Sequence, residues 1–226
     1  MRVNDTLLLD AGNTLIYLDH DAVAELTGLD ASALRSAEGA AKRAYEATLR
    51  SGTSHEDGWL LFMQELLARS GAREGLTEQV RMLRAEHDRR NLWRKVPPGL
   101  REVLTEARDR GWKLGVVSNS EGRLVEILTE VGIAEFFGVI VDSAVVGVAK
   151  PDPRIFALAL DALGSSAQKA IYAGDVPDVD VAGARAAGIE AVLVDSLDHY
   201  PDYTEAPRFQ RTADLVRALL SGAEIR

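Results

Sequence analysis

Apolar residues recur along the chain in two different rhythms, and the rhythm changes near Val96. Between residues 19 and 94 the apolar positions return every three or four residues, as on one face of a helix. Glycines 71 and 75 interrupt this pattern and separate two of its segments. The spacing predicts an all-helical block of three or four helices with no convincing strand, and its clearest segments are 31–52, 58–71 and 76–93.

Beyond the run VPPG, residues 96–99, short apolar runs alternate with helical patterns. Strands are predicted at 5–10, 112–120, 137–143, 169–175 and 189–195, and helices at 100–111, 121–132, 152–164, 180–188 and 213–222. Apolar strands that alternate with helices indicate a parallel sheet covered by helices on both faces. The predicted fold class is therefore α/β, a doubly wound, Rossmann-like parallel sheet with an inserted all-helical cap domain. We expect residues 1–18 and 96–226 to form the core and residues 19–95 to form the cap.

Composition narrows the classes of function. The 226 residues are 46% hydrophobic, which suffices for one sizeable core or for a core and a smaller second lobe. A formal net charge of −9 disfavours a nucleic-acid partner, and the absence of cysteine excludes disulfides, thiolate metal sites and cysteine nucleophiles. No apolar run approaches the ~20 residues that span a bilayer, so no membrane partner is expected. We see no signal peptide and expect a cytoplasmic protein, as a monomer or a homodimer.

Polar side chains follow the predicted strands at the points where these strands end. They are Asp10, Ser118, Asn119 and Asp175, with Asp178 and Asp180 close behind, and Lys150 follows the strand 137–143 after a loop. Each has an ordinary structural explanation, because Asp, Ser and Asn form turns and cap helices and a lysine before proline is often solvated. The joint pattern favours function, since the carboxyl ends of parallel strands meet at the edge of the sheet where ligands bind.

These residue types suit phosphoryl chemistry. Asp10 and Asp175 on neighbouring strands would repel each other unless a cation lay between them, and carboxylate oxygens suit Mg²⁺. With the cation bound, Asp10 can attack phosphorus as an anionic nucleophile. Ser118, with nearby backbone N–H groups, can hold phosphate oxygens, and Lys150 can offset negative charge on Asp10 and on the phosphoryl group.

In this order and spacing, four segments resemble the motifs of the haloacid dehalogenase superfamily, which consists mostly of phosphatases. They are LLLDAGNTL, GVVSNS, AKPDP and YAGDVPDVDVAGARAAG. The resemblance covers residues 1–19 and about 96–226, and the helical block is similar to the family's cap in position and character. It implies Asp10 as nucleophile, Ser118 and Asn119 as substrate-binding residues, and Lys150 as charge stabiliser. It also implies Asp10 and Asp175 as Mg²⁺ ligands, with Asp180 as a nearby acid of the same metal site, either bound to the ion or beside its ligands, and with Asp178 the weaker candidate.

Gly12 departs from the family pattern. Family phosphatases usually have a second Asp two residues after the nucleophile, whose carbonyl binds the metal and whose carboxyl is the general acid and base. The carbonyl of Gly12 can still bind Mg²⁺, but glycine has no group that protonates a leaving oxygen, a contribution of about 10²–10⁴-fold. Dehalogenases of the family tend to have an aromatic residue at this position, which Gly12 does not match either. A second, smaller departure is Val179, at a position that is often Asn.

Several hypotheses therefore stay open at the level of sequence. The favoured one is a Mg²⁺-dependent hydrolase of small phosphorylated metabolites, restricted to good leaving groups or supplied with a proton by the cap. Its candidate donors are Asp19, His20, His55 and His87, none of which is assigned a role. The second is a hydrolase of the carbon–halogen bond of a 2-haloacid. The third is a phosphate-ligand binding protein with little turnover.

Overall fold

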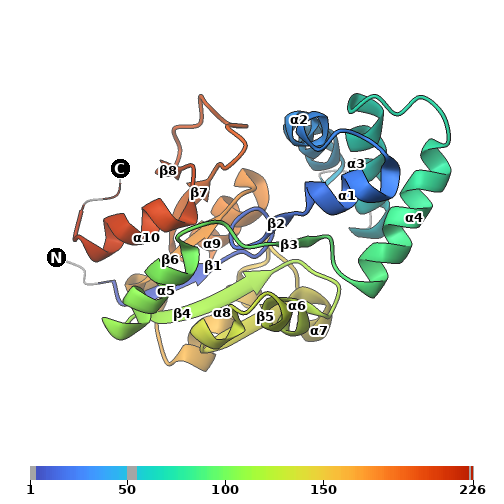
Figure 1. Ribbon diagram of the computed structural model, residues 1–226. Coiled ribbons are helices and arrows are strands. Elements are labelled where there is room, and N and C mark those ends of the chain that lie inside the picture. Colours follow the sequence, from blue (N-terminus) through green and yellow to red (C-terminus); the bar gives the residue numbers. More distant parts are fainter. Residues whose placement is uncertain (1–3, 50–54, 224, 226) are drawn as a thin grey trace. The chain divides into compact units, whose positions relative to one another are not determined.

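The computed structural model describes residues 4–49, 55–223 and 225, and it divides into two compact units (Figure 1). The first comprises Met1–Tyr17 and Lys95–Arg226, and the second Leu18–Arg94. Each unit has its own hydrophobic core. No helix in the described part of the chain is both long and apolar enough to cross a membrane.

The first unit is built on a parallel sheet with the strand order β5-β4-β1-β6-β7-β8. Its strands are β1 (Thr6–Leu9), β4 (Lys113–Ser118), β5 (Val139–Asp142), β6 (Ala170–Gly174), β7 (Glu190–Val194) and β8 (Arg208–Phe209). The chain adds β4 and β5 on one side of β1 and then β6, β7 and β8 on the other. The order of the strands thus reverses at β1, and ligands bind beyond the carboxyl ends of the strands at such a point.

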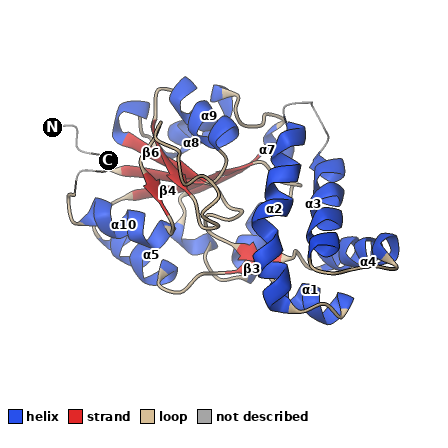
Figure 2. Cartoon of the chain, turned by 90° about the horizontal axis from the view of Figure 1, so that it is seen from above, coloured by secondary structure: helices blue, strands red, loops and turns tan. Residues whose placement is uncertain are grey.

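Helices cover both faces of this sheet, with α8 and α9 on one face and α5 and α10 on the other (Figure 2). The helices of the unit are α5 (Leu100–Asp109), α6 (Leu124–Glu130), α7 (Ser143–Val146), α8 (Pro153–Leu163), α9 (Ala182–Ala186) and α10 (Thr212–Leu220). Leu8 of β1 and Tyr172 of β6 pack against Phe156 of α8 and Ala184 of α9 in one buried cluster. The predicted doubly wound parallel sheet is confirmed.

The second unit contains, in its described part, the helices α1 (His20–Thr27), α2 (Ala31–Leu49), α3 (His55–Arg69) and α4 (Leu76–Arg89). Leu34 and Ala41 of α2, Met63 and Leu66 of α3 and Leu83 of α4 are buried in its core. Apolar residues at three- and four-residue spacing lie on one face of each helix, and these faces pack together and become buried. The predicted helical block is confirmed within the described residues.

Two details of the sequence prediction are wrong. The helix expected to reach residue 93 ends at Arg89, and Trp93–Lys95 form β3, which pairs with β2 (Tyr17–Leu18) in a small separate sheet. Arg90, which follows the helix, is extended, and beyond it the ring of His87 accepts the backbone N–H of Leu92 through Nδ1 at 3.3 Å. Strand β8 was not expected, since two residues carry no readable alternation.

Candidate active site

Asp10 occupies the centre of the carboxyl edge of the sheet because it directly follows β1. The backbone N–H of Asp10 continues the ladder by donating to the carbonyl of Ala173 at 2.9 Å. Strand β1 pairs with β4 on one side and with β6 on the other. Ser118, the last residue of β4, and Asp175, directly after β6, therefore end beside Asp10, and all three are buried.

Three buried carboxylates meet at this edge. Asp10, Asp175 and Asp180 each place an oxygen within 4.8 Å of the other two. Asp180 reaches the cluster from a one-turn π-helix, Pro177–Val181, that precedes α9. Asp178, in the same turn, is exposed and is not one of this group. An all-oxygen donor set of this kind fits a hard divalent cation.

Gly174 allows Asp180 to approach the end of β6. A Cβ built on Gly174 would lie 2.3 Å from Cγ of Asp180, which is closer than two carbon atoms can pack. Oδ2 of Asp180 also accepts the backbone N–H of Val176 at 2.9 Å, so the turn holds its own acid in place. The glycine before Asp175 is therefore required by the position of Asp180.

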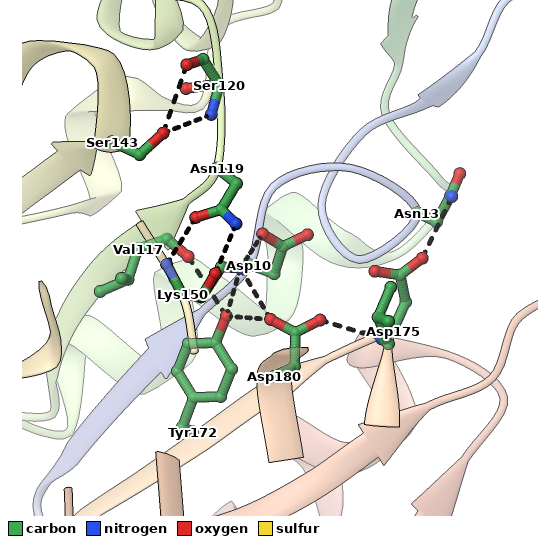
Figure 3. A network of polar contacts seen from close by, with 11 residues as sticks. Asp10, Asn13, Val117, Asn119, Ser120, Ser143, Lys150, Tyr172, Asp175 and Asp180 are labelled. Atoms are coloured by element: carbon green, nitrogen blue, oxygen red, sulfur yellow. Dashed lines mark hydrogen bonds and ion pairs between the residues drawn. The ribbon is translucent and has the colours of Figure 1, made fainter. Parts of the chain in front are cut away.

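Lys150 joins the acids from the loop that precedes α8. Its Nζ donates to Oδ1 of Asp10 at 2.6 Å, to Oδ1 of Asp180 at 2.7 Å and to the phenolic oxygen of Tyr172 at 2.8 Å (Figure 3). Burial alone lowers the pKa of Lys150, but the charges of Asp10 and Asp180 outweigh it and raise that pKa above its usual value. The side chain is therefore a buried ammonium.

The carboxyl of Asp10 has an unusual proton affinity. Burial, the charge of Asp180 and the charge of Asp175 together raise its pKa to about 7, against the attraction of Lys150, which lowers it. When all the acids are ionised, three carboxylates face one ammonium, which leaves an excess of two negative charges. A divalent cation would balance that excess. The net charge of the site and its oxygen donors therefore both favour a hard divalent cation.

Asn119 holds the backbone of Lys150 from the end of β4. Its Oδ1 accepts the N–H of Lys150 at 2.8 Å, and its Nδ2 donates to the carbonyl of the same residue at 2.9 Å (Figure 3).

Asp142, another buried acid at this edge, has a structural role, because its carboxylate accepts the backbone N–H groups of Gly122, Leu124 and Ala144. Asp142 was not among the site residues predicted from the sequence.

The turn after Asp10 contains Gly12 and Asn13. Asn13 has a φ of 53°, and its Nδ2 donates to Oδ2 of Asp175 at 3.1 Å. A Cβ added to Gly12 would meet nothing within 4 Å, and its φ lies outside the left-handed region. Neither crowding nor backbone strain therefore requires glycine at position 12.

The residues considered as alternative proton donors make contacts within the helical unit. The side chain of Asp19 caps α1 by accepting the N–H of Ala22, and it pairs with Arg94 at 2.9 Å. His20 lies 2.9 Å from Glu38, and the ring of His87 packs against Trp59 and Trp93. The side chain of His55 is outside the described part of the structure.

Sequence reasoning missed two members of the site, Tyr172 and Asn13. Tyr172 lies inside an apolar strand, where an aromatic residue is expected for packing alone. Asn13 stands in a run of turn-forming residues, and asparagine is common in the left-handed conformation of turns. Only the three-dimensional contacts with Lys150 and Asp175 distinguish these residues from ordinary strand and turn residues.

The structure thus combines a doubly wound parallel sheet with a buried lysine and three clustered carboxylates at its switch point. The chain belongs to the haloacid dehalogenase-like hydrolases, since that family's model matches residues 4–188. The protein is therefore a hydrolase.

Individual relatives agree with this assignment. The chain is 37% identical over 164 residues to a phosphoserine phosphatase of Thermus thermophilus, a match that covers 72% of this chain and 64% of that protein. It is 32% identical to haloacid dehalogenase-like hydrolase domain-containing protein 3 of Bos taurus, over 83% of this chain and 80% of that protein. Its fold is similar to that of the HAD-hydrolase YfnB of Bacillus subtilis, with a TM-score of 0.69 and 18% identity over 96% of this chain and 99% of that one.

Proposed function

We propose that the protein is a Mg²⁺-dependent phosphatase of small phosphorylated metabolites and that Asp10 is its nucleophile. One observation carries the proposal, namely a buried aspartate bonded to a buried lysine and lying beside two further carboxylates that can share a cation with it. The similarity to a phosphoserine phosphatase supports the same reaction class. Asp10, Asp175, Asp180 and the carbonyl of Gly12 are the groups to which we assign the metal.

The reaction we assign to these residues has two steps. Lys150 binds Oδ1 of Asp10, so Oδ2 is the oxygen assigned to the attack on phosphorus. A bond forms between this oxygen and phosphorus, and the bond to the leaving oxygen breaks. Bound Mg²⁺ supplies charge neutralisation, which lets the anionic phosphate approach the acids. Ser118 and backbone N–H groups hold the phosphoryl oxygens, with Asn119 contributing beside them, and water then hydrolyses the aspartyl-phosphate.

Gly12 limits which substrates this site can use well. The leaving oxygen departs with a negative charge unless it receives a proton, and position 12 has no side chain to supply one. We infer that the enzyme acts fastest on phosphate esters whose alcohols are acidic enough to leave unprotonated. We also infer that the helical unit, Leu18–Arg94, serves as the cap domain and contributes to the choice of substrate.

Release of phosphate from an aryl phosphate in the presence of Mg²⁺ tests the proposal. We expect release to stop on addition of a chelator and in the Asp10→Asn variant. Asp178→Asn is the matched control, because it removes an exposed carboxylate from the same segment without touching the buried cluster. Activity that survives Asp10→Asn would reject the proposed nucleophile, and chelator-insensitive release of halide from a 2-haloacid would favour the carbon–halogen reaction instead.

A further inference from the structure

Tyr172 connects the hydrophobic core to the site. The residue is completely buried in β6, and its ring packs edge-on against Phe156 at 4.9 Å between ring centres. Its hydroxyl lies at the other end of the ring, among the charged groups of the site (Figure 3). Burying a hydroxyl lowers the stability of the folded protein unless the hydroxyl is hydrogen-bonded. A phenylalanine would fill nearly the same space without that loss of stability. The hydroxyl therefore calls for an explanation beyond packing.

The hydroxyl completes the set of acceptors around Lys150. An ammonium group has three N–H donors. The structure gives it three acceptors, which are the carboxylates of Asp10 and Asp180 and the phenolic oxygen of Tyr172, at 2.6, 2.7 and 2.8 Å. Because each donor has its own acceptor, Nζ is held from three directions.

The phenol is itself oriented by its surroundings. Its O–H donates to Oδ1 of Asp180 at 2.7 Å, and the carbonyl of Val117 at 3.2 Å is a longer acceptor for the same group. Lys150, Tyr172 and Asp180 thus form a closed ring of hydrogen bonds in which Tyr172 both accepts and donates. Networks of this kind hold their members in place more firmly than separate pairs do.

We propose that Tyr172 is a positioning residue, whose phenolic oxygen is the third acceptor that fixes the Lys150 ammonium between Asp10 and Asp180. Two carboxylates alone leave the ammonium free to tilt, and its third N–H would then be buried without an acceptor. A tilted ammonium would no longer direct one of its N–H groups at Oδ1 of Asp10. The kinetic part of this inference rests on the proposed phosphatase function.

The kinetic test compares Tyr172→Phe with Phe156→Leu. The first removes only the hydroxyl, and the second loosens the same aromatic pair without touching the site. For Tyr172→Phe we expect kcat to fall about tenfold, with KM within about twofold of the wild-type value. For Phe156→Leu we expect a lower melting temperature with kcat close to that of the wild type. Equal effects of the two variants on kcat would overturn the inference.

A second measurement does not depend on turnover. In ¹⁵N-lysine-labelled protein, an ammonium with three buried hydrogen bonds exchanges its protons slowly and gives its own side-chain NMR signal, which Lys150→Arg assigns. We expect Phe156→Leu to retain the signal and Tyr172→Phe to broaden or lose it. An unchanged signal in Tyr172→Phe would overturn the inference. If the wild-type protein releases no phosphate, the proposed function fails, and this signal alone decides the role of Tyr172.

Discussion

The ammonium of Lys150 lies 2.6 Å from a carboxylate oxygen of Asp10, although 140 positions separate the two residues in the chain. Both side chains are buried, so neither charge can be satisfied by water if the other is removed. The pair connects the loop before α8 to the end of β1. The geometry of the site therefore depends on it.

Replacing Lys150 by Met should destabilise the protein as well as inactivate it. Breaking a buried ion pair costs about 3–5 kcal/mol, because the remaining charge stays buried without its partner. Urea unfolding measures this loss in the free energy of unfolding. Lys169→Met is the control, since its exposed ammonium lies 3.9 Å from Asp5, and we expect a change below about 1 kcal/mol. Similar losses in the two variants would contradict the buried network.

The pKa of Asp10 predicts how stability without metal depends on pH. The folded protein holds the Asp10 proton up to a pKa of about 7, whereas the ordinary value is 3.8. Between these values the folded state binds more protons than the unfolded state, so this group's contribution falls as pH rises from 4 to 7. We expect the free energy of unfolding of the wild type, relative to Asp10→Asn, to decrease over this range. A difference that stays constant or increases would contradict the shift.

Mg²⁺ should stabilise the protein more at pH 8 than at pH 5.5. A cation that binds only the folded protein raises its melting temperature, and protons compete with it for Asp10. Thermal melts with and without Mg²⁺ at the two pH values measure the effect, and Asp175→Asn, which removes one proposed ligand, should reduce it. Equal stabilisation of the wild type and Asp175→Asn would argue against a metal in this cluster.

Gly12→Asp should improve turnover of esters with poor leaving groups. A Cβ added at position 12 would meet no atom within 4 Å, and the backbone there is not left-handed, so we expect the variant to fold as the wild type does. General acid help is worth about 10²–10⁴-fold, and we expect a gain of at least about tenfold on alkyl phosphates and a smaller one on aryl phosphates. The ratio of kcat values on the two substrate types is the measurement. An unchanged ratio would indicate that another group already supplies the proton.

Gly174→Ala should damage the site through Asp180. The added methyl would lie 2.3 Å from Cγ of Asp180, so the acid or the end of β6 must move. We expect a lower melting temperature and a fall in kcat of about tenfold or more. Gly12→Ala, where the added carbon meets open space, is the control for stability and should leave the melting temperature nearly unchanged. Full activity in Gly174→Ala would show that Asp180 need not occupy its present position.

The sequence predicted the parts of the fold that depend on repeated local patterns. Apolar runs such as Leu7–Leu9 ended in polar residues, and parallel strands bring such ends to one edge, so Asp10 and Asp175 could be placed together in advance. The end of α4 could not be predicted, because the apolar spacing continues past Arg89 while the chain turns into β3 and the ring of His87 accepts the N–H of Leu92, a contact that the sequence pattern does not show. The roles of Tyr172 and Asn13 could not be predicted either, because Tyr172 stands in an ordinary apolar strand and Asn13 in an ordinary run of turn-forming residues.

The most direct test of the central claim is to trap the phosphorylated enzyme. The wild-type protein is mixed with an aryl phosphate and Mg²⁺, quenched in acid within the first turnovers, and treated with borohydride, which reduces an aspartyl-phosphate to homoserine. Peptide mass spectrometry then locates the reduced residue. We predict homoserine at position 10 and none in Asp10→Asn. Rapid phosphate release with an unmodified Asp10, or with the modification at another acid, would contradict the assignment of Asp10 as the nucleophile.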